Sequence, residues 1–246
     1  KLTWNYSEVS FLSPHLSPEP SPPIWRHTHN HAGELTRSTR DHGPTLEYRH
    51  DALGRRITRT RNGLVTRWLW HGDVLLHEWT HPHDVITWAH EPGRPAPLAR
   101  ITAATRHAVV TDHLGSPLAL LDERGQLAWS AELGPHGLPH PVRGDPALCP
   151  FRHPGQLADP DTGLHHNRLR DLDPATGRYL TADPLGLLGG LDLHAHVDDP
   201  LTQTDILGLT TDIPHSVHAR VAAELVADFP LHDLPPHLAE LARRPG

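Results

Sequence analysis

The expected fold is decided by residues 48–55, YRHDALGR, and by the segment from Arg55 to Arg61, in which long polar and β-branched residues follow one another. Such a segment suits a half-exposed β-strand. The dipeptide Asn62-Gly63 comes next and predicts a two-residue type I′ turn before a second strand-like segment, residues 64–70. An earlier stretch, residues 27–33, aligns with residues 48–54 at an offset of 21 residues. A period in this range is typical of a repeat architecture.

Further short strands, separated by turns and with no helix between them, continue the pattern. We expect them at residues 74–79, 85–89, 98–101, 107–111, 118–121 and 127–131, with a hairpin loop at residues 122–125. A helical spacing of apolar residues occurs only at residues 217–226, and a short second helix is expected at residues 236–243. The sequence therefore predicts a mainly β fold of antiparallel β-hairpins with a short helical C-terminal tail.

The composition narrows the class of protein. The 246 residues include 26 Pro and 19 Gly, which favours short elements and many turns over long helices. Residues 1–25 are rich in Pro and Ser, and we expect a linker there. The net charge of −7, with the 24 histidines neutral, argues against nonspecific nucleic-acid binding. No apolar run is long enough to span a membrane, and the first residues lack the pattern of a signal peptide.

Two residue types bear on the chemistry and the origin of the chain. The single cysteine, Cys149, excludes an intrachain disulfide and a metal site built from several cysteines. The chain contains no Met and starts at Lys1, so we expect it to be part of a longer protein.

Several ordered motifs carry a resemblance to a known family. The unit at residues 48–55 has the form YxHDxxGR, with a weaker copy at residues 27–33. Downstream follow residues 111–117 (TDHLGSP), 122–130 (DERGQLAWS), 150–156 (PFRHPGQ), 161–168 (DTGLHHNR), 173–179 (DPATGRY) and 183–190 (DPLGLLGG). Together these motifs resemble the Rhs/YD-repeat family, in particular the C-terminal core region of Rhs proteins, over residues 27–209.

The resemblance implies a strip of β-hairpins that spirals into a hollow shell around a variable C-terminal toxin. It divides the chain into a linker (1–25), a YD-repeat strip (26–148), an Rhs core (149–209) and a truncated helical tail (210–246), too short for an ordinary toxin enzyme. The implied partners are the remaining part of the shell, the enclosed toxin, secretion-spike proteins and an immunity protein. The implied destination is outside the bacterial cell, delivered by a secretion apparatus. Nothing in this scheme needs a cofactor.

The resemblance also implies an aspartyl autoprotease that cuts after the Leu of a PxxxxDPxGL motif. Residues 200–209, PLTQTDILGL, match this motif except that Ile206 replaces the second proline. The scissile bond would therefore join Leu209 to Thr210. This position coincides with the shift from strand-like to helix-like composition.

By resemblance, the two catalytic carboxylates are Asp183 and Asp205. Carboxylates a few ångströms apart do not both ionise easily, so one keeps a proton and polarises the carbonyl while the other activates water. We expect Arg178 to hold one carboxylate in its ionised form. The residues expected to support the site through turns or close backbone approach are Pro184, Gly186, Gly189, Gly190, Pro200 and Gly208.

Departures from the family pattern leave the enzymatic activity open. The family's GGxNxYxYxPNP is altered in residues 189–200, where Asp192, Asp198 and Asp199 add carboxylates that would shift the titration of the pair or replace a member. Asp-Pro-x-Gly is also a common turn sequence. Two alternatives therefore stand beside the autoprotease. One is a structural or surface-binding YD-repeat module with a decayed protease, and the other is a remnant of a degraded rhs gene.

Histidine clusters at residues 27–31, 165–166 and 194–196 have the spacing of metal ligands on strands. Some of these histidines, however, stand where the family usually has Tyr, namely His29, His50, His166, His194 and His196. One base change converts a Tyr codon into a His codon, so compositional drift explains these residues without a metal. We expect no metal site.

Overall fold

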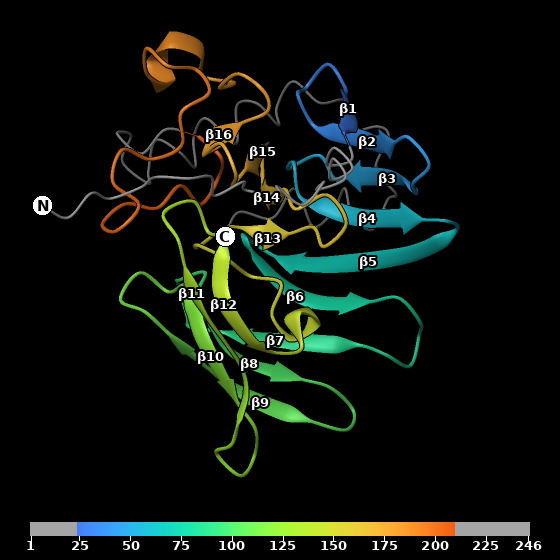
Figure 1. Cartoon of the computed structure of the whole chain (residues 1–246), viewed down its shortest axis with the longest axis vertical. Coiled ribbons are helices and arrows are strands. Elements are labelled where there is room, and N and C mark those ends of the chain that lie inside the picture. Colours follow the sequence, from blue (N-terminus) through green and yellow to red (C-terminus); the bar gives the residue numbers. More distant parts are fainter. Residues whose placement is uncertain (1–23, 210–246) are drawn as a thin grey trace, which may run out of the picture.

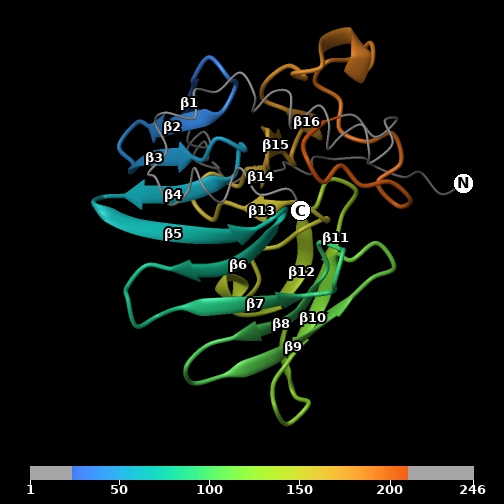
Figure 2. The same ribbon diagram turned by 180° about the vertical axis from the view of Figure 1, so that it is seen from behind.

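The computed structural model describes residues 24–209, which form a curved strip of antiparallel strands and a smaller unit packed against it (Figure 1). The strip has twelve strands that pair strictly in chain order. They are β1 (Trp25–His29), β2 (Leu35–Arg40), β3 (Thr45–His50), β4 (Arg56–Arg61), β5 (Leu64–His71), β6 (Val74–Trp79), β7 (Ile86–His90), β8 (Pro97–Ile101), β9 (Arg106–Thr111), β10 (Pro117–Leu121), β11 (Leu127–Leu133) and β12 (Pro139–Gly144). Seen from behind, the strip bends so that β10–β12 run at a steep angle to β5–β7 (Figure 2).

The smaller unit, residues 145–209, is called the core unit below. It starts with the 3-10 helix η1 (Pro146–Leu148) and contains a second antiparallel sheet of four short strands. These are β13 (Leu157–Ala158), β14 (His165–Asn167), β15 (Arg170–Asp173) and β16 (Arg178–Tyr179). A further 3-10 helix, η2 (Gly186–Gly189), and an irregular segment complete the unit up to Leu209.

A recurrent turn explains why the strip is built from hairpins. Asp51 accepts hydrogen bonds through Oδ1 from the backbone N–H groups of Leu53 and Arg55, at 2.9 and 3.1 Å, and Gly54 then adopts a φ of 74°. The same side-chain acceptor, three residues before a glycine of positive φ, recurs at Asn30, Asp112 and Asp122. An acceptor of this kind followed by glycine closes a turn without leaving backbone donors unpaired. Turn geometry therefore explains the Asp and the Gly of each repeat.

The mainly β fold and the predicted strands of the strip are confirmed. Asn62 and Gly63 both have positive φ, 51° and 82°, as a type I′ turn requires. Trp25, the last residue of the expected linker, begins β1, and the other linker residues before Ile24, like the expected helices of the tail, lie outside the described residues. Within residues 24–209 no helix combines the length and the apolar character needed to cross a membrane.

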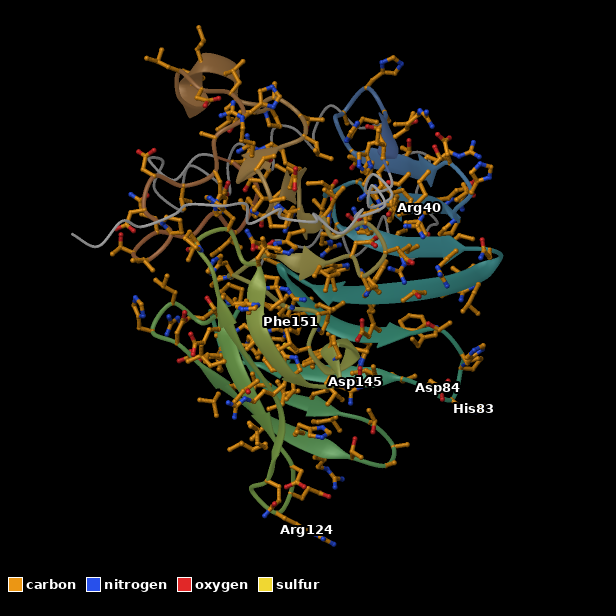
Figure 3. The ribbon with its side chains drawn as sticks, viewed as in Figure 1. Arg40, His83, Asp84, Arg124, Asp145 and Phe151 are labelled. Carbon is orange, nitrogen blue, oxygen red and sulfur yellow. The ribbon has the colours of Figure 1, made fainter. Side chains whose placement is uncertain are left out.

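Three apolar clusters hold the core unit against the strip. Each combines buried residues of the strip with one buried residue of the core unit: Leu35, Leu46 and Tyr48 with Leu164; Leu120, Trp129 and Ala131 with Cys149; Leu75 and Trp88 with Leu157. Phe151 lies within the curve of the strip, whereas His83, Asp84 and Arg124 lie at hairpin tips (Figure 3). Each large apolar side chain buried in this way stabilises the fold by about 1.5–3 kcal/mol.

Buried ion pairs join the same two parts through charge. Arg56 of β4 is 2% exposed, and its guanidinium lies 2.7 Å from Asp171 of β15 and 3.8 Å from Asp159. Asp159 also accepts a hydrogen bond of 2.9 Å from the hydroxyl of Tyr48. Loss of one partner would leave a buried charge without compensation, which typically costs about 3–5 kcal/mol. The strip and the core unit therefore depend on each other.

Two histidines lie beside this ion pair: Nδ1 of His166 is 3.5 Å from Oδ1 of Asp171, and His50 neighbours His166. The rings of His50 and His166 have centroids 5.3 Å apart. Burial, reinforced by the neighbouring His166 ring and the charge of Arg56, lowers the pKa of His50 to about 2. Burial likewise lowers the pKa of His165 to about 3 and that of His196 to about 4. These imidazoles are neutral in the folded protein, whereas histidine in an unfolded chain titrates near pH ~6.5.

We therefore expect the free energy of unfolding to fall as the pH falls below about 6.5, because the unfolded chain binds protons that the folded chain does not. For His50 alone the loss over two pH units is about 3 kcal/mol, since one pKa unit corresponds to about 1.4 kcal/mol. Urea unfolding at two pH values measures this loss. His50→Phe should reduce it, and the control His81→Phe, in an exposed turn, should not. The same pH dependence in all three chains would contradict the explanation.

Candidate functional site

The core unit brings Asp183 and Asp205 to one guanidinium group, that of Arg170. The Nη2 atom of Arg170 lies 2.9 Å from Oδ2 of Asp183 and 3.6 Å from Oδ2 of Asp205. The side chains of these three residues are 1–3% exposed. Arg170 opens β15, Asp183 follows β16, and Asp205 lies in the irregular segment near Leu209. The two carboxylates that the sequence pairs therefore lie beside the same cation. This cation, Arg170, is absent from the predicted site.

The Asp183 carboxylate is fixed by its own turn. Its Oδ1 accepts a hydrogen bond of 2.8 Å from the N–H of Leu185, and its backbone N–H donates to the carbonyl of Leu193, also at 2.8 Å. The helix η2 then carries the chain back over the carboxylate. A Cβ atom on Gly189 would lie 2.7 Å from the carboxyl carbon of Asp183. Only glycine lets the backbone approach this closely.

The Asp205 carboxylate is held through both of its oxygens. Oδ2 accepts a hydrogen bond of 2.8 Å from the hydroxyl of Tyr179, and Oδ1 accepts one of 2.8 Å from the backbone N–H of Leu209. Burial raises the pKa of Asp205 to about 6, outweighing the hydrogen bond from Tyr179 and the charge of Arg170, which act in the opposite direction. Asp205 is therefore a carboxyl group that keeps its proton up to about pH 6.

The segment that ends at Leu209 is clamped by the core unit. Arg170 Nε donates to the carbonyl of Gly208, and Leu169 donates its N–H to the carbonyl of Leu207 at 3.1 Å. Gly208 has a φ of 68°, and a Cβ atom there would lie 2.2 Å from the carbonyl oxygen of Asn167. Leu209 itself is 1% exposed. The residue on the amino side of the expected scissile bond is thus buried and hydrogen-bonded to Asp205, whereas Thr210 lies outside the described residues.

The expected role of Arg178 is wrong. Its guanidinium pairs with Asp192, with N–O distances of 2.8 and 2.7 Å, and both side chains are about half exposed. Successive residues of a strand point to opposite faces, so Tyr179 turns inward and Arg178 turns outward. Arg170 takes the expected place beside the carboxylates. Its only sequence signal is that it shares one strand face with the buried Leu172.

Two of the added carboxylates, Asp192 and Asp199, have partners of their own and do not replace Asp183 or Asp205. Asp192 is occupied by Arg178, and Asp199 accepts hydrogen bonds from the N–H of Leu201 and the hydroxyl of Thr202. Of the remaining predicted supporting residues, Pro184 and Gly190 are exposed, and Gly186 and Pro200 are half-buried. Within residues 24–209, no group of three or more His, Cys, Asp or Glu residues has the arrangement of a metal site.

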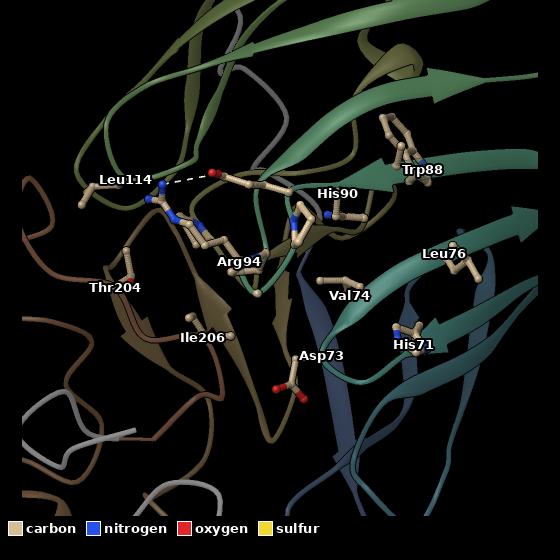
Figure 4. A pocket seen from close by; sticks show the side chains of 16 residues that line it. His71, Asp73, Val74, Leu76, Trp88, His90, Arg94, Leu114, Thr204 and Ile206 are labelled. Atoms are coloured by element: carbon tan, nitrogen blue, oxygen red, sulfur yellow. Dashed lines mark hydrogen bonds and ion pairs between the residues drawn. The ribbon is translucent and has the colours of Figure 1, made fainter. Parts of the chain in front are cut away.

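A cleft of about 990 Å³ lies on the other side of the Asp205 segment (Figure 4). Thr204 and Ile206 form one wall, and turn residues after β5 and β7, including Asp73 and Arg94, form the other. Neither carboxylate of the pair lines it. The substitution of Ile206 for proline therefore faces this cleft, away from the Arg170 contacts.

Comparisons with known proteins agree with this architecture. A family model described as the teneurin YD-shell matches residues 25–187. The chain is 36% identical over 220 residues to the toxin protein Tse5 of Pseudomonas aeruginosa, a match that covers 72% of this chain and 17% of that protein. It is 32% identical over 209 residues to double-stranded DNA deaminase toxin A of Burkholderia cenocepacia, covering 71% of this chain and 15% of that protein. The chain thus spans only a small part of these relatives.

Solved structures share the fold. The Tc holotoxin pore of Photorhabdus luminescens superimposes with a TM-score of 0.62 at 23% identity, over 78% of this chain and 10% of that chain. The TcdB2-TccC3 structure without its hypervariable C-terminal region gives a TM-score of 0.60 at 23% identity, over 75% of this chain and 10% of that chain.

The two arginines offer a direct test of the arrangement. Arg170→Met should lower the free energy of unfolding by about 3–5 kcal/mol, because it leaves two buried carboxylates without their cation. Arg178→Met removes an exposed ion pair and should change the stability little. Urea unfolding of both variants beside the parent chain measures the difference. Similar losses in the two variants would contradict the assignment of Arg170 as the buried partner.

Proposed function

The chain belongs to the teneurin YD-shell family, and we propose that it forms the end of a β-shell of an Rhs-type toxin and cuts its own chain after Leu209. The match to the family model covers all twelve strands of the strip and the core unit as far as Leu187. The strands of the strip pair in chain order and curve, as a shell wall requires.

The partners follow from the two ends of the strip. Among the described residues, β1 and β12 each pair with a single neighbouring strand, so each has one unpaired edge. Unpaired edges invite pairing with further strands. We propose that the remaining part of the shell continues the strip and that the parts are a linker (1–25), a YD-repeat strip (26–148), an Rhs core (149–209) and a tail (210–246). The relatives named as toxins support an enclosed C-terminal toxin. We also propose that the protein is delivered out of the bacterial cell by a secretion apparatus, with secretion-spike proteins and an immunity protein as further partners.

One observation carries the proposal of self-cleavage. Asp183 and Asp205 share one buried guanidinium nitrogen, and Asp205 also holds the N–H of Leu209. An aspartyl site needs two neighbouring carboxyl groups of unequal proton affinity, placed at the bond that is cut. The contacts with Arg170 bring the two carboxyl groups together. The hydrogen bond from Leu209 places Asp205 next to the bond that would be cut.

The proposed reaction is hydrolysis of the peptide bond between Leu209 and Thr210. Asp183, held 2.9 Å from Nη2 of Arg170, accepts a proton from water as the water oxygen attacks the Leu209 carbonyl carbon. Asp205, protonated because of its raised pKa, donates its proton to the carbonyl oxygen. As the C–N bond breaks, Asp183 passes the proton it took from water to the nitrogen of Thr210, and Asp205 takes back a proton from a hydroxyl of the tetrahedral intermediate. Leu209 is left with a carboxylic acid and Thr210 with an amine, and proton transfer between these products gives a carboxylate and an ammonium group. No cofactor takes part.

A non-catalytic shell module is the second candidate. Arg170 compensates the charge of both carboxylates, and such a buried triad also serves simply to fix the end of the core unit. Ile206 in place of proline favours this candidate as well. The two candidates differ in one outcome, which is whether the bond after Leu209 breaks.

Self-cleavage predicts that the freshly made parent chain loses a piece that begins at Thr210. Asp183→Asn and Asp205→Asn remove one carboxyl group each and should slow this cut by at least about a hundred-fold, since the pair acts as a unit. Intact-mass spectrometry of the purified chains measures the cut and locates its bond.

Asp192→Asn is the matched control, because it makes the same chemical change at an exposed carboxylate. It should leave the cut unchanged. A folded parent chain that stays intact would favour the non-catalytic module, and a chain that fails to stay soluble would favour the remnant of a degraded gene. A cut that persists in both site variants would exclude the pair.

A further inference from the structure

Tyr179 contacts two of the three charged residues of the site, Asp205 and Arg170. Its hydroxyl donates to Oδ2 of Asp205 at 2.8 Å. Its ring lies under the guanidinium of Arg170, with 3.8 Å between the Arg170 Cζ atom and the ring centroid. Tyr179 is 2% exposed. One residue of β16 thus binds the acid of the proposed reaction with its polar end and the cation with its face.

The direction of the Tyr179 hydrogen bond is fixed by Asn167. The side-chain amide Nδ2 of Asn167 donates to the Tyr179 hydroxyl oxygen at 2.6 Å and to the backbone carbonyl of Asp205 at 2.7 Å. A phenol has a single hydrogen, so a hydroxyl that accepts from Asn167 directs this hydrogen to Asp205. The reverse orientation of the amide would place its oxygen against the Asp205 carbonyl and is excluded by this contact. Asn167 therefore orients Tyr179, and Tyr179 orients the Asp205 carboxyl.

The Tyr179 hydroxyl stays protonated while Asp205 titrates. Burial and the neighbouring Asp205 charge raise the pKa of Tyr179 well above its ordinary value. The charged and titratable groups that face Asp205 are Arg170 on β15, Asp183 after β16 and Tyr179 itself. Among them, Tyr179 is the neutral donor, and its hydrogen bond favours the ionised form of Asp205. It opposes the effect of burial on the same group.

We propose that Tyr179 is a positioning residue of the cleavage site: its hydroxyl fixes the plane and the proton affinity of the Asp205 carboxyl, and its ring fixes the guanidinium of Arg170. The effect of Tyr179 on cleavage rests on the proposed function, whereas its effect on the titration of Asp205 does not. Without the hydroxyl, Asp205 keeps its proton to a higher pH. It also loses one of the two hydrogen bonds that set its orientation.

The test is Tyr179→Phe, which retains the ring over Arg170 and removes only the hydroxyl. The matched control is Tyr48→Phe. Tyr48 is also buried, donates to a buried carboxylate, that of Asp159, at 2.9 Å, and lies under an arginine, Arg56, at 4.3 Å. Both variants lose one buried hydrogen bond of the same kind, so a general loss of stability affects both alike.

The first readout does not need cleavage. Carbon-13 NMR of carboxyl-labelled Asp follows the titration of Asp205, identified by the signal that disappears in Asp205→Asn, with all chains in the same cleaved or uncleaved form. The titration midpoint should rise by about one pH unit in Tyr179→Phe, the shift expected for loss of a hydrogen bond to a charged group. It should stay at the parent value in Tyr48→Phe. An unchanged midpoint in Tyr179→Phe would overturn the proposal, whether or not the parent chain cuts itself.

The second readout is the first-order rate of the cut as a function of pH. In the proposed reaction Asp205 acts in its protonated form, so the rate falls where Asp205 ionises. In Tyr179→Phe this fall should move to higher pH by about one unit, and the maximal rate should drop about ten-fold because the acid is less well oriented. The Tyr48→Phe profile should match the parent. If the parent chain stays intact, the proposed function is wrong, and the titration of Asp205 alone decides whether Tyr179 is a positioning residue. If the parent chain is cut and the Tyr179→Phe profile is identical to it, only the proposal for Tyr179 is wrong.

Discussion

Buried arginine–carboxylate contacts are the constraint on which the rest of this structure depends. Burying an unpaired guanidinium is costly, so Arg56 and Arg170 fix the chain segments that supply their carboxylates. Arg56 joins β4 of the strip to Asp171 and Asp159 of the core unit, and Arg170 joins two distant turns of the core unit to each other. The apolar clusters add stability between the strip and the core unit, and the paired charges oppose arrangements that would leave them without partners.

The two arginine sites have the same design and differ in one respect. In each, a buried tyrosine donates to an aspartate while the arginine lies over the tyrosine ring. Around Arg56 the carboxylates serve only to join the strip to the core unit. Around Arg170 one carboxylate also holds the N–H of Leu209, at the bond proposed to be cut. The same set of contacts stabilises the fold around Arg56, whereas around Arg170 it also lies at the proposed cleavage site.

The strip could be predicted from the sequence because its signals are local. The Asp of each repeat, the following glycine and the Asn62-Gly63 turn specify hairpins without reference to distant residues. The pairing of Asp183 with Asp205 follows from resemblance to a family, not from spacing. The sequence points to Arg178 rather than Arg170, because β15 and β16 are too short for strand alternation to show which residue faces inward. The roles of Tyr179 and Asn167 depend on contacts between separate turns, which no local pattern contains.

The central claim is that the chain itself breaks the bond after Leu209. The most direct measurement follows the parent chain, made in a reconstituted translation system free of proteases, by mass spectrometry at several dilutions. The account predicts a product that ends at Leu209 and a first-order rate constant that does not change with dilution, as an intramolecular reaction requires. A rate that falls with dilution, or a folded chain that stays whole, would contradict it.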